Sequence, residues 1–254
     1  MRYIKRYAKA FYMSCSMFSA VPLPSHARDE THLSLVLPCL PLVGILLGAA
    51  WWGTAKLIAL SGMHPVLAAA VLAVTPFLLS GFLHLDGYMD TNDAVLSRRP
   101  LEDKLRILKD PHAGAFSIIA LVILFVLQFA AIYAAIDGEK ELLTLPFIVV
   151  TSRCCSSLSL LSLKVMPQSN YAKSFKQNTS SAHKCFVIVL SVLTMVAAYM
   201  CMGISGLTMV VFTVLGFAGA MTYAYKQFKG VSGDLAGYSL VIGELCGLIA
   251  LAVI

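Results

Sequence analysis

Long apolar stretches dominate the sequence and restrict what the chain can fold into. They lie at about residues 34–58, 65–83, 115–136, 142–163, 185–203, 206–224 and 238–254, close to the roughly 20 residues that a helix needs to cross a bilayer. Because backbone polar groups inside a bilayer must bond to one another, such stretches fold as helices. Only 13% of the residues are charged, against about a quarter in soluble domains. We predict an all-α, polytopic integral membrane protein of about seven transmembrane helices, forming a single domain over residues 1–254.

Basic residues are concentrated in four of the connecting segments, at 1–33, 84–114, 164–184 and 225–237. These segments hold sixteen of the nineteen lysines and arginines, and the other three are Lys56, Lys140 and Arg153. Seven spans would place all four segments on the same side of the membrane. The positive-inside rule assigns that side to the cytoplasm.

The N-terminal segment 1–33 has a basic start followed by an apolar run from Ala10 to Val21, which Pro22 and Pro24 end. Signal peptides share the first two features, but no convincing small-residue cleavage site follows. We therefore predict an amphipathic helix in the membrane interface, with its basic side chains near lipid head groups.

Segment 84–114 begins with the acidic motif His84-Leu85-Asp86-Gly87-Tyr88-Met89-Asp90-Thr91-Asn92-Asp93. In a helix, Asp86, Asp90 and Asp93 share one face, where neighbouring carboxylates about 6 Å apart repel by roughly 3 kcal/mol at an effective dielectric near 20. Either this face points into open water or cations neutralise it, and hard cations such as Mg²⁺ take carboxylate oxygens. We favour a metal site, with ligands from Asp86, Asp90, Asp93, Asp110 and Asp234.

His84 would point away from this acidic face. A hydrogen-bonded core or interfacial histidine is the simpler interpretation, and a general base is the alternative.

Several residues are candidates for holding phosphate. Gly233 lies in Gly230-Val231-Ser232-Gly233-Asp234, where glycines let the backbone approach a phosphate closely. Charge and location add Arg106, Lys109, Arg153 and Lys173. Arg153 and Glu244 fall inside predicted spans, where a charge costs about 2.5–3.5 kcal/mol and usually faces the protein interior. Either these two side chains pair with each other, or Arg153 reaches a substrate phosphate.

The motif His84-Leu85-Asp86-Gly87-x-x-Asp90-Thr91-x-Asp93-Ala94, with Lys109-Asp110 and Gly114-Ala115-Phe116 after it, resembles the cobalamin synthase family, the adenosylcobinamide-GDP ribazoletransferases. Gly230-x-Ser232-Gly233-Asp234-x-x-Gly237 and Glu244 are similar to the second motif of that family, and Val21-Pro22-x-Pro24 fits its N-terminus. The resemblance covers essentially the whole chain. It departs from the family pattern where Phe82, Ser117 and Lys229 replace glycines, Ser232 replaces a threonine, and Val241 stands where many members have an acid.

The resemblance implies a bacterial inner-membrane transferase of vitamin B12 biosynthesis whose active face is cytoplasmic. A ribose hydroxyl of α-ribazole, or of its 5′-phosphate, would attack the diphosphate of adenosylcobinamide-GDP. GMP would leave, and adenosylcobalamin or its 5′-phosphate would form, with Mg²⁺ as the expected metal. Phosphoryl transfer needs charge neutralisation and in-line positioning, which carboxylates and Mg²⁺ supply.

On this basis we expect Asp86 and Asp90 to be catalytic. We expect the lipid bilayer and the two substrates as partners and no nucleic acid, while homo-oligomer formation stays open.

Two other classes of membrane protein are alternatives to this interpretation. CDP-alcohol phosphotransferases share an Asp-Gly carboxylate motif and Mg²⁺, but Asp90-Thr91 and Pro100 stand where that family has Ala-Arg and a glycine. A cation-coupled transporter usually binds its ion near the bilayer midplane, within repeated halves. Here the acids cluster at the predicted cytoplasmic edge and no convincing repeat is found.

Overall fold

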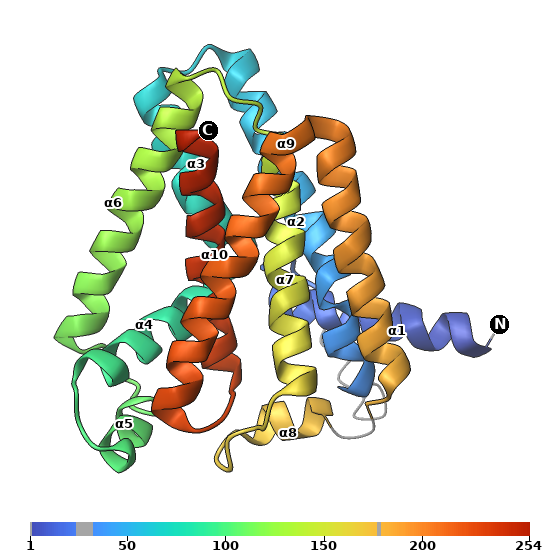
Figure 1. The fold of residues 1–254 in the computed structure, drawn as a ribbon, viewed down its shortest axis with the longest axis vertical. Helices are drawn as coiled ribbons and strands as arrows, with labels where there is room; N and C mark the ends of the chain where they lie inside the picture. Colours follow the sequence, from blue (N-terminus) through green and yellow to red (C-terminus); the bar gives the residue numbers. More distant parts are fainter. Residues whose placement is uncertain (1, 24–32, 177–178) are drawn as a thin grey trace.

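The computed structural model describes residues 2–23, 33–176 and 179–254 (Figure 1). Within these residues the chain is helical, apart from an isolated β-bridge between Val165 and Val231. The helices are α1 (Arg2–Phe18), α2 (Leu33–Ser61), α3 (Pro65–Leu79), α4 (Leu83–Leu96), α5 (Leu101–Ile107), α6 (Ala115–Asp137), α7 (Thr144–Ser162), α8 (Asn170–Lys176), α9 (Ser181–Phe228) and α10 (Gly233–Val253). The predicted all-α class is confirmed. Residues 24–32, which include Pro24 of the N-terminal motif, lie outside the described residues.

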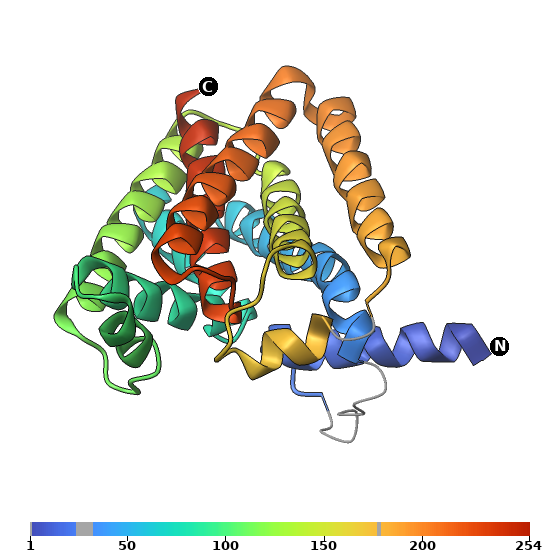
Figure 2. The ribbon, with the colours of Figure 1, turned by 60° about the horizontal axis from the view of Figure 1, so that its bottom comes forward.

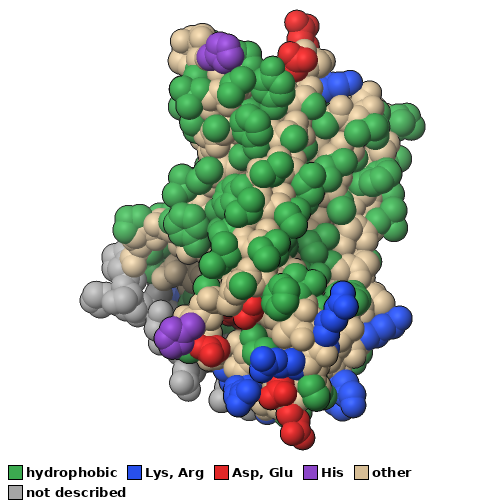
Figure 3. Space-filling model, turned by 90° about the vertical axis from the view of Figure 1, so that its left-hand side faces the viewer, with side chains coloured by type: hydrophobic (Ala, Val, Ile, Leu, Met, Phe, Trp, Pro, Cys, Tyr) green, Lys and Arg blue, Asp and Glu red, His purple; other side chains and the backbone are tan. Residues whose placement is uncertain are grey.

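The structure has the apolar helices of a polytopic membrane protein. In the described part of the chain, α2, α6, α7, α9 and α10 are each long and apolar enough to cross a membrane. The bent pair of α3 and α4 adds a sixth candidate span. Figure 3 shows a broad hydrophobic band around the middle of the molecule, with charged side chains gathered at its two ends.

Two of the predicted spans, 185–203 and 206–224, belong to one long helix that doubles back. The backbone of α9 breaks at Gly203, whose φ of 64° and ψ of −144° are not helical. A positive φ is readily adopted only by glycine. The chain reverses there, so that α9 forms two arms that meet at the turn and spread apart below it, with α7 between them (Figures 1 and 2).

The predicted span 65–83 ends earlier than expected, because the chain bends by 94° between α3 and α4. Gly81, with a φ of 64°, follows the last turn of α3, and its N–H bonds to the carbonyl of Leu78. The N–H of Phe82 bonds to the carbonyl of Phe77, which completes the hydrogen-bond pattern of a Schellman helix end. The bend directs α4 across the end of the helix bundle.

The basic segments of the sequence gather at one end of the molecule. Helices α4, α5 and α8 and the start of α10 lie at the lower end in Figure 1, and the reversal of α9 lies at the upper end. Helix α1 runs crosswise to the spanning helices toward the same lower end (Figure 2) and packs on α2, where the Ser14 hydroxyl donates to the Val36 carbonyl over 3.2 Å. This orientation suits the interfacial position predicted for α1.

Candidate active site

Helices α4 and α10 approach each other very closely at two glycines. A Cβ atom on Gly87 would lie 2.8 Å from the Cα atom of Asp234, and one on Gly237 would lie 3.3 Å from the Cα atom of His84. Beside these glycines the rings of Tyr88 and Tyr238 stack with centroids 5.9 Å apart. The close packing places Asp234 of α10 against the acidic part of α4.

Four predicted aspartates therefore come together at this junction. Asp86, Asp90 and Asp93 follow one another along α4, Asp234 joins them from α10, and we call these four residues the carboxylate cluster. Asp86 is exposed and the other three are half-buried. Burial raises the pKa of Asp90 most, the charges of Asp86, Asp234 and Asp93 add to this effect, and together they bring the pKa to about 7. The junction thus concentrates negative charge, and no lysine or arginine among the described residues forms an ion pair with Asp90.

Asp93 is held at the far end of the cluster by the chain before α6. Its carboxylate lies so close to Gly114 that any side chain there would collide with it. Helix α6 is in turn tied to α4 by Tyr88, whose hydroxyl donates to the Ala120 carbonyl over 3.2 Å. The glycine of the Gly114-Ala115-Phe116 motif therefore makes room for an acid of the cluster.

The chemistry of the cluster fits a hard cation. Its donors are carboxylate oxygens, the ligands that Mg²⁺ prefers, and a bound cation would relieve the repulsion that raises the pKa of Asp90. In the described part of the chain, however, no group of three histidine, cysteine or acidic side chains is placed to hold an ion. The four side chains are close enough to repel one another without converging on one point.

The start of α10 offers backbone donors beside the cluster. The Ser232 hydroxyl caps the helix by accepting from the Leu235 N–H over 3.3 Å, and Gly233 is exposed with open space around it. The N-terminus of a helix favours anions. Gly230 is different, because it packs tightly on Met166 and serves the turn. Of the two glycines, Gly233 is the one placed to approach a phosphate.

The remaining candidate residues bond to groups outside the cluster or are exposed. Asp110 is exposed and accepts from the backbone N–H of His112 over 3.0 Å, and hydrogen bonds from His112 lower the pKa of Asp110. Arg106 pairs with Asp103 over 3.2 Å, and Lys109 is exposed. Lys173, on α8, donates to the Pro167 carbonyl.

Arg153 forms a buried ion pair with Glu244, the first of the two arrangements considered from the sequence. Both side chains are almost fully buried, and Ser152 connects them by accepting from Arg153 over 2.9 Å and donating to Glu244 over 2.7 Å. The pair lies between α7 and α10.

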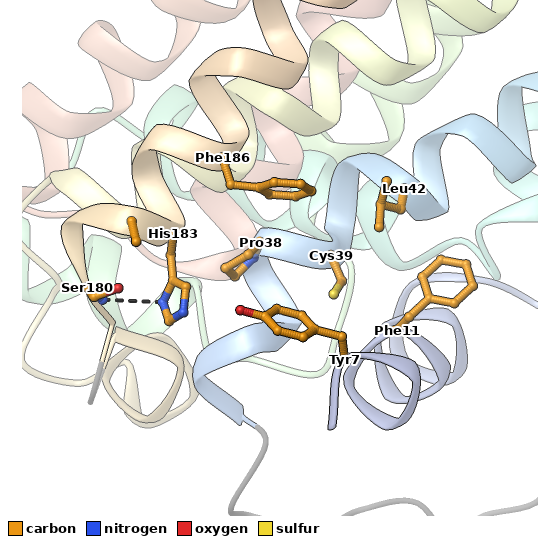
Figure 4. Close-up of a pocket in the computed structure, with 9 residues that line it drawn as sticks. Tyr7, Phe11, Pro38, Cys39, Leu42, Ser180, His183 and Phe186 are labelled. Atoms are coloured by element: carbon orange, nitrogen blue, oxygen red, sulfur yellow. Dashed lines mark hydrogen bonds between the residues drawn. The ribbon is translucent and has the colours of Figure 1, made fainter. Parts of the chain in front are cut away.

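The structure adds a feature that the residue pattern did not reveal. A cavity of about 510 Å³, here called the junction cavity, borders the cluster at Gly233 and Asp234, and His84 is among the residues that line it. The spacing of the motif predicted only that His84 turns away from the acidic face. A second cavity, of about 430 Å³, lies between α1, α2 and the first arm of α9, and the described residues that line it include no acid (Figure 4).

Together, the helical fold and the carboxylate cluster define a class: a polytopic membrane protein with an acidic site at one end of its helix bundle, next to a helix N-terminus. Residues 10–252 match the family described as cobalamin-5-phosphate synthase, so the chain belongs to that family.

Similar proteins cover nearly the whole chain. A protein of Clostridium botulinum is 35% identical over 245 residues, which are 96% of this chain and 97% of the relative. One of Clostridium perfringens is 34% identical over 99% of this chain and 100% of its own length. One of Pseudomonas aeruginosa is 30% identical over 92% of this chain and 91% of its own length. All three are named adenosylcobinamide-GDP ribazoletransferase. No solved structure matches.

Proposed function

We propose that this chain joins adenosylcobinamide-GDP to α-ribazole, or to its 5′-phosphate, and releases GMP. Membership of the cobalamin-5-phosphate synthase family and the names of full-length relatives support the reaction. The observation that carries the proposed site is the junction of α4 and α10, where Asp86, Asp90, Asp93 and Asp234 gather beside the exposed Gly233.

In the proposed reaction a ribose hydroxyl of α-ribazole attacks the phosphorus that carries the cobinamide. The new P–O bond forms as the bond to GMP breaks, and the hydroxyl proton passes to a carboxylate of the cluster. A carboxylate of the cluster that is not bound to the cation can take this role. Backbone N–H groups at Gly233 bind phosphate oxygens and hold the diphosphate in line.

Mg²⁺ is the cation proposed for the cluster, and Asp86, Asp90, Asp93 and Asp234 would supply the carboxylate ligands of one or two such ions once their side chains turn toward one another. When bound, Mg²⁺ would neutralise the diphosphate and stabilise the departing GMP. Asp110, also proposed as a ligand, would first have to release its contact with His112.

We further propose that the chain lies in the bacterial inner membrane as one domain, with the cluster facing the cytoplasm. The basic segments and the cluster share the lower end of the molecule in Figure 1. Lysines and arginines gather on the cytoplasmic side of inner-membrane proteins.

The test is nucleotide release by the purified chain in detergent with adenosylcobinamide-GDP, α-ribazole and Mg²⁺. GMP should appear, and Asp86→Asn and Asp90→Asn should each lower its rate by roughly a hundredfold or more. Glu102→Gln, an acid-to-amide change at an exposed position of α5, is the matched control and should retain the rate. Folded wild-type protein that releases no GMP would refute the proposal. Release of CMP from a CDP-alcohol would instead favour the rival enzyme class.

A further inference from the structure

The junction cavity is a mostly apolar chamber that ends at the carboxylate cluster. Its walls come from α1, α2, α4, α7, α8 and α10, with Met13, Phe18, Leu37 and Leu160 among the apolar residues. Gly233 and Asp234 line the same space. A ligand inside this chamber would therefore have one end beside the proposed reaction site.

His84 gives the cavity a polar group without a partner among the described residues. Its side chain is 6% exposed, and its Nε2 atom is buried with no hydrogen-bond partner in this part of the chain. Buried polar atoms are nearly always hydrogen-bonded, so a buried atom without a partner, on a residue that lines a cavity, points to a ligand. The ring of Phe18 lies within 15° of parallel to the imidazole, with centroids 6.3 Å apart. The two rings give this part of the wall flat surfaces.

The proposed substrates contain three large groups, a corrin, a guanine and a dimethylbenzimidazole. These groups differ in how well they fit the junction cavity. The volume of about 510 Å³ is in the usual range for sites of small ligands, which excludes a corrin ring with its adenosyl and nucleotide arms. Guanine presents several donors and acceptors, whereas most of the lining is apolar. The dimethylbenzimidazole of α-ribazole is flat and apolar, and one ring nitrogen is left as an acceptor once the ribose is attached.

We infer that the junction cavity binds the benzimidazole base of α-ribazole and that His84 donates a hydrogen bond to the free ring nitrogen of that base. The ribose then lies at the rim formed by Gly233 and Asp234, where its hydroxyl faces the carboxylate cluster. This assignment rests on the proposed function for the identity of the ligand. It makes His84 a residue that determines specificity for the base, distinct from the acids that act on phosphate.

The first experiment fills the cavity. Ala172 of α8 lines it and is buried, so Ala172→Leu places extra carbon atoms where the base would lie. The KM for α-ribazole should rise about tenfold, while kcat and the KM for adenosylcobinamide-GDP stay unchanged. Ala197→Leu, on the exposed face of the first arm of α9, is the matched control and should change none of these constants.

The second experiment removes either the acceptor of the proposed hydrogen bond, which is the free ring nitrogen of the base, or its donor, which is His84. The corresponding riboside of dimethylindole has a C–H in place of the free ring nitrogen, and the wild type should use it about tenfold less well than α-ribazole. His84→Ala should lose this discrimination, and His84→Gln, which keeps an N–H donor, should regain part of it. A purely structural histidine would leave the ratio between the two ribosides unchanged.

Equilibrium dialysis of α-ribazole against the protein alone separates the two proposals. If the wild type binds α-ribazole and Ala172→Leu weakens that binding, the cavity assignment stands even where no GMP is released. If GMP is released but Ala172→Leu leaves the KM and the binding of α-ribazole unchanged, the cavity assignment is wrong while the proposed function stands. If folded His84→Ala still prefers α-ribazole over the dimethylindole riboside, His84 does not donate the proposed hydrogen bond to the base.

Discussion

The raised pKa of Asp90, which burial causes in the first place and neighbouring charges in the second, predicts an unusual dependence of stability on pH. The pKa of Asp90 is about 7 in the folded protein, against an ordinary value of 3.8. Between these two pH values the folded state holds the proton more tightly than the unfolded state does. The proton on Asp90 therefore stabilises the folded state, and the free energy of unfolding falls as pH rises from about 4 to about 7 and this proton is lost. Above that range the full penalty of an ionised Asp90 remains unless a cation is bound.

The size of the energetic penalty for ionising Asp90 in the folded protein follows from the difference between its folded and ordinary pKa values. A difference of about three pH units corresponds to about 4 kcal/mol at about 1.4 kcal/mol per unit, which is an upper limit. Water around the exposed Asp86 screens part of the repulsion, so we expect about 2–4 kcal/mol. Asp90→Asn keeps the shape of the side chain and removes the charge. At about pH 8 without divalent cations the variant should unfold several degrees higher than the wild type.

Thermal unfolding in detergent measures this, at about pH 8 and about pH 5, with EDTA and with Mg²⁺. The advantage of Asp90→Asn should shrink at the lower pH, where Asp90 of the wild type is protonated. Mg²⁺ should raise the unfolding temperature of the wild type more than that of the variant. Glu102→Gln serves again as the control and should differ from the wild type by little. A variant no more stable than the wild type at about pH 8, or equally stabilised at both pH values, would refute the electrostatic argument.

Three further changes test the architecture around the cluster. Phe82→Gly should raise stability by about 1 kcal/mol in thermal unfolding, because Phe82 has a φ of 61° that glycine adopts without strain. Gly87→Ala should push α4 away from α10, which lowers stability by about 1–3 kcal/mol and GMP release at least tenfold. The control Gly53→Ala, at a glycine with open space around it, should be neutral or stabilising. Arg153→Met should cost about 3–5 kcal/mol because it leaves Glu244 buried and unpaired, and adding Glu244→Leu should restore most of that stability in the same assay.

Much of the fold could be predicted from the sequence, because span length and apolar content are local properties. Each predicted span overlaps a helix or an arm of a helix, and the helices of the basic segments gather at one end of the molecule, as predicted. The reversal of α9 at Gly203 and the bend at Gly81 could not be located in this way. Both depend on backbone angles at single glycines within apolar sequence, and apolar periodicity carries no information about those angles.

The site could be predicted in part. Helical spacing correctly placed Asp86, Asp90 and Asp93 in succession along one helix, since i, i+4 and i+7 are fixed by helix geometry. The approach of Asp234 depends on the contact of Gly87 with another helix, and the junction cavity depends on six helices at once. For the same reason, no sequence pattern could indicate that the Nε2 atom of His84 is buried without a partner among the described residues. Spacing along one segment cannot report such tertiary relations.

The glycine positions of the resembled family acquire a geometric explanation here. Phe82 and Lys229, which replace two of those glycines, both have left-handed backbones, with φ values of 61° and 55°. Phe82 directly precedes α4 and Lys229 directly follows α9, so each stands where the chain turns toward an acid of the cluster. Glycine would suit these two positions because it can turn the chain without strain, and contact with phosphate is not needed to explain it. This chain carries side chains at both turns, at a cost of about 1–2 kcal/mol each, and the close packing of α4 on α10 holds the strained turns in place.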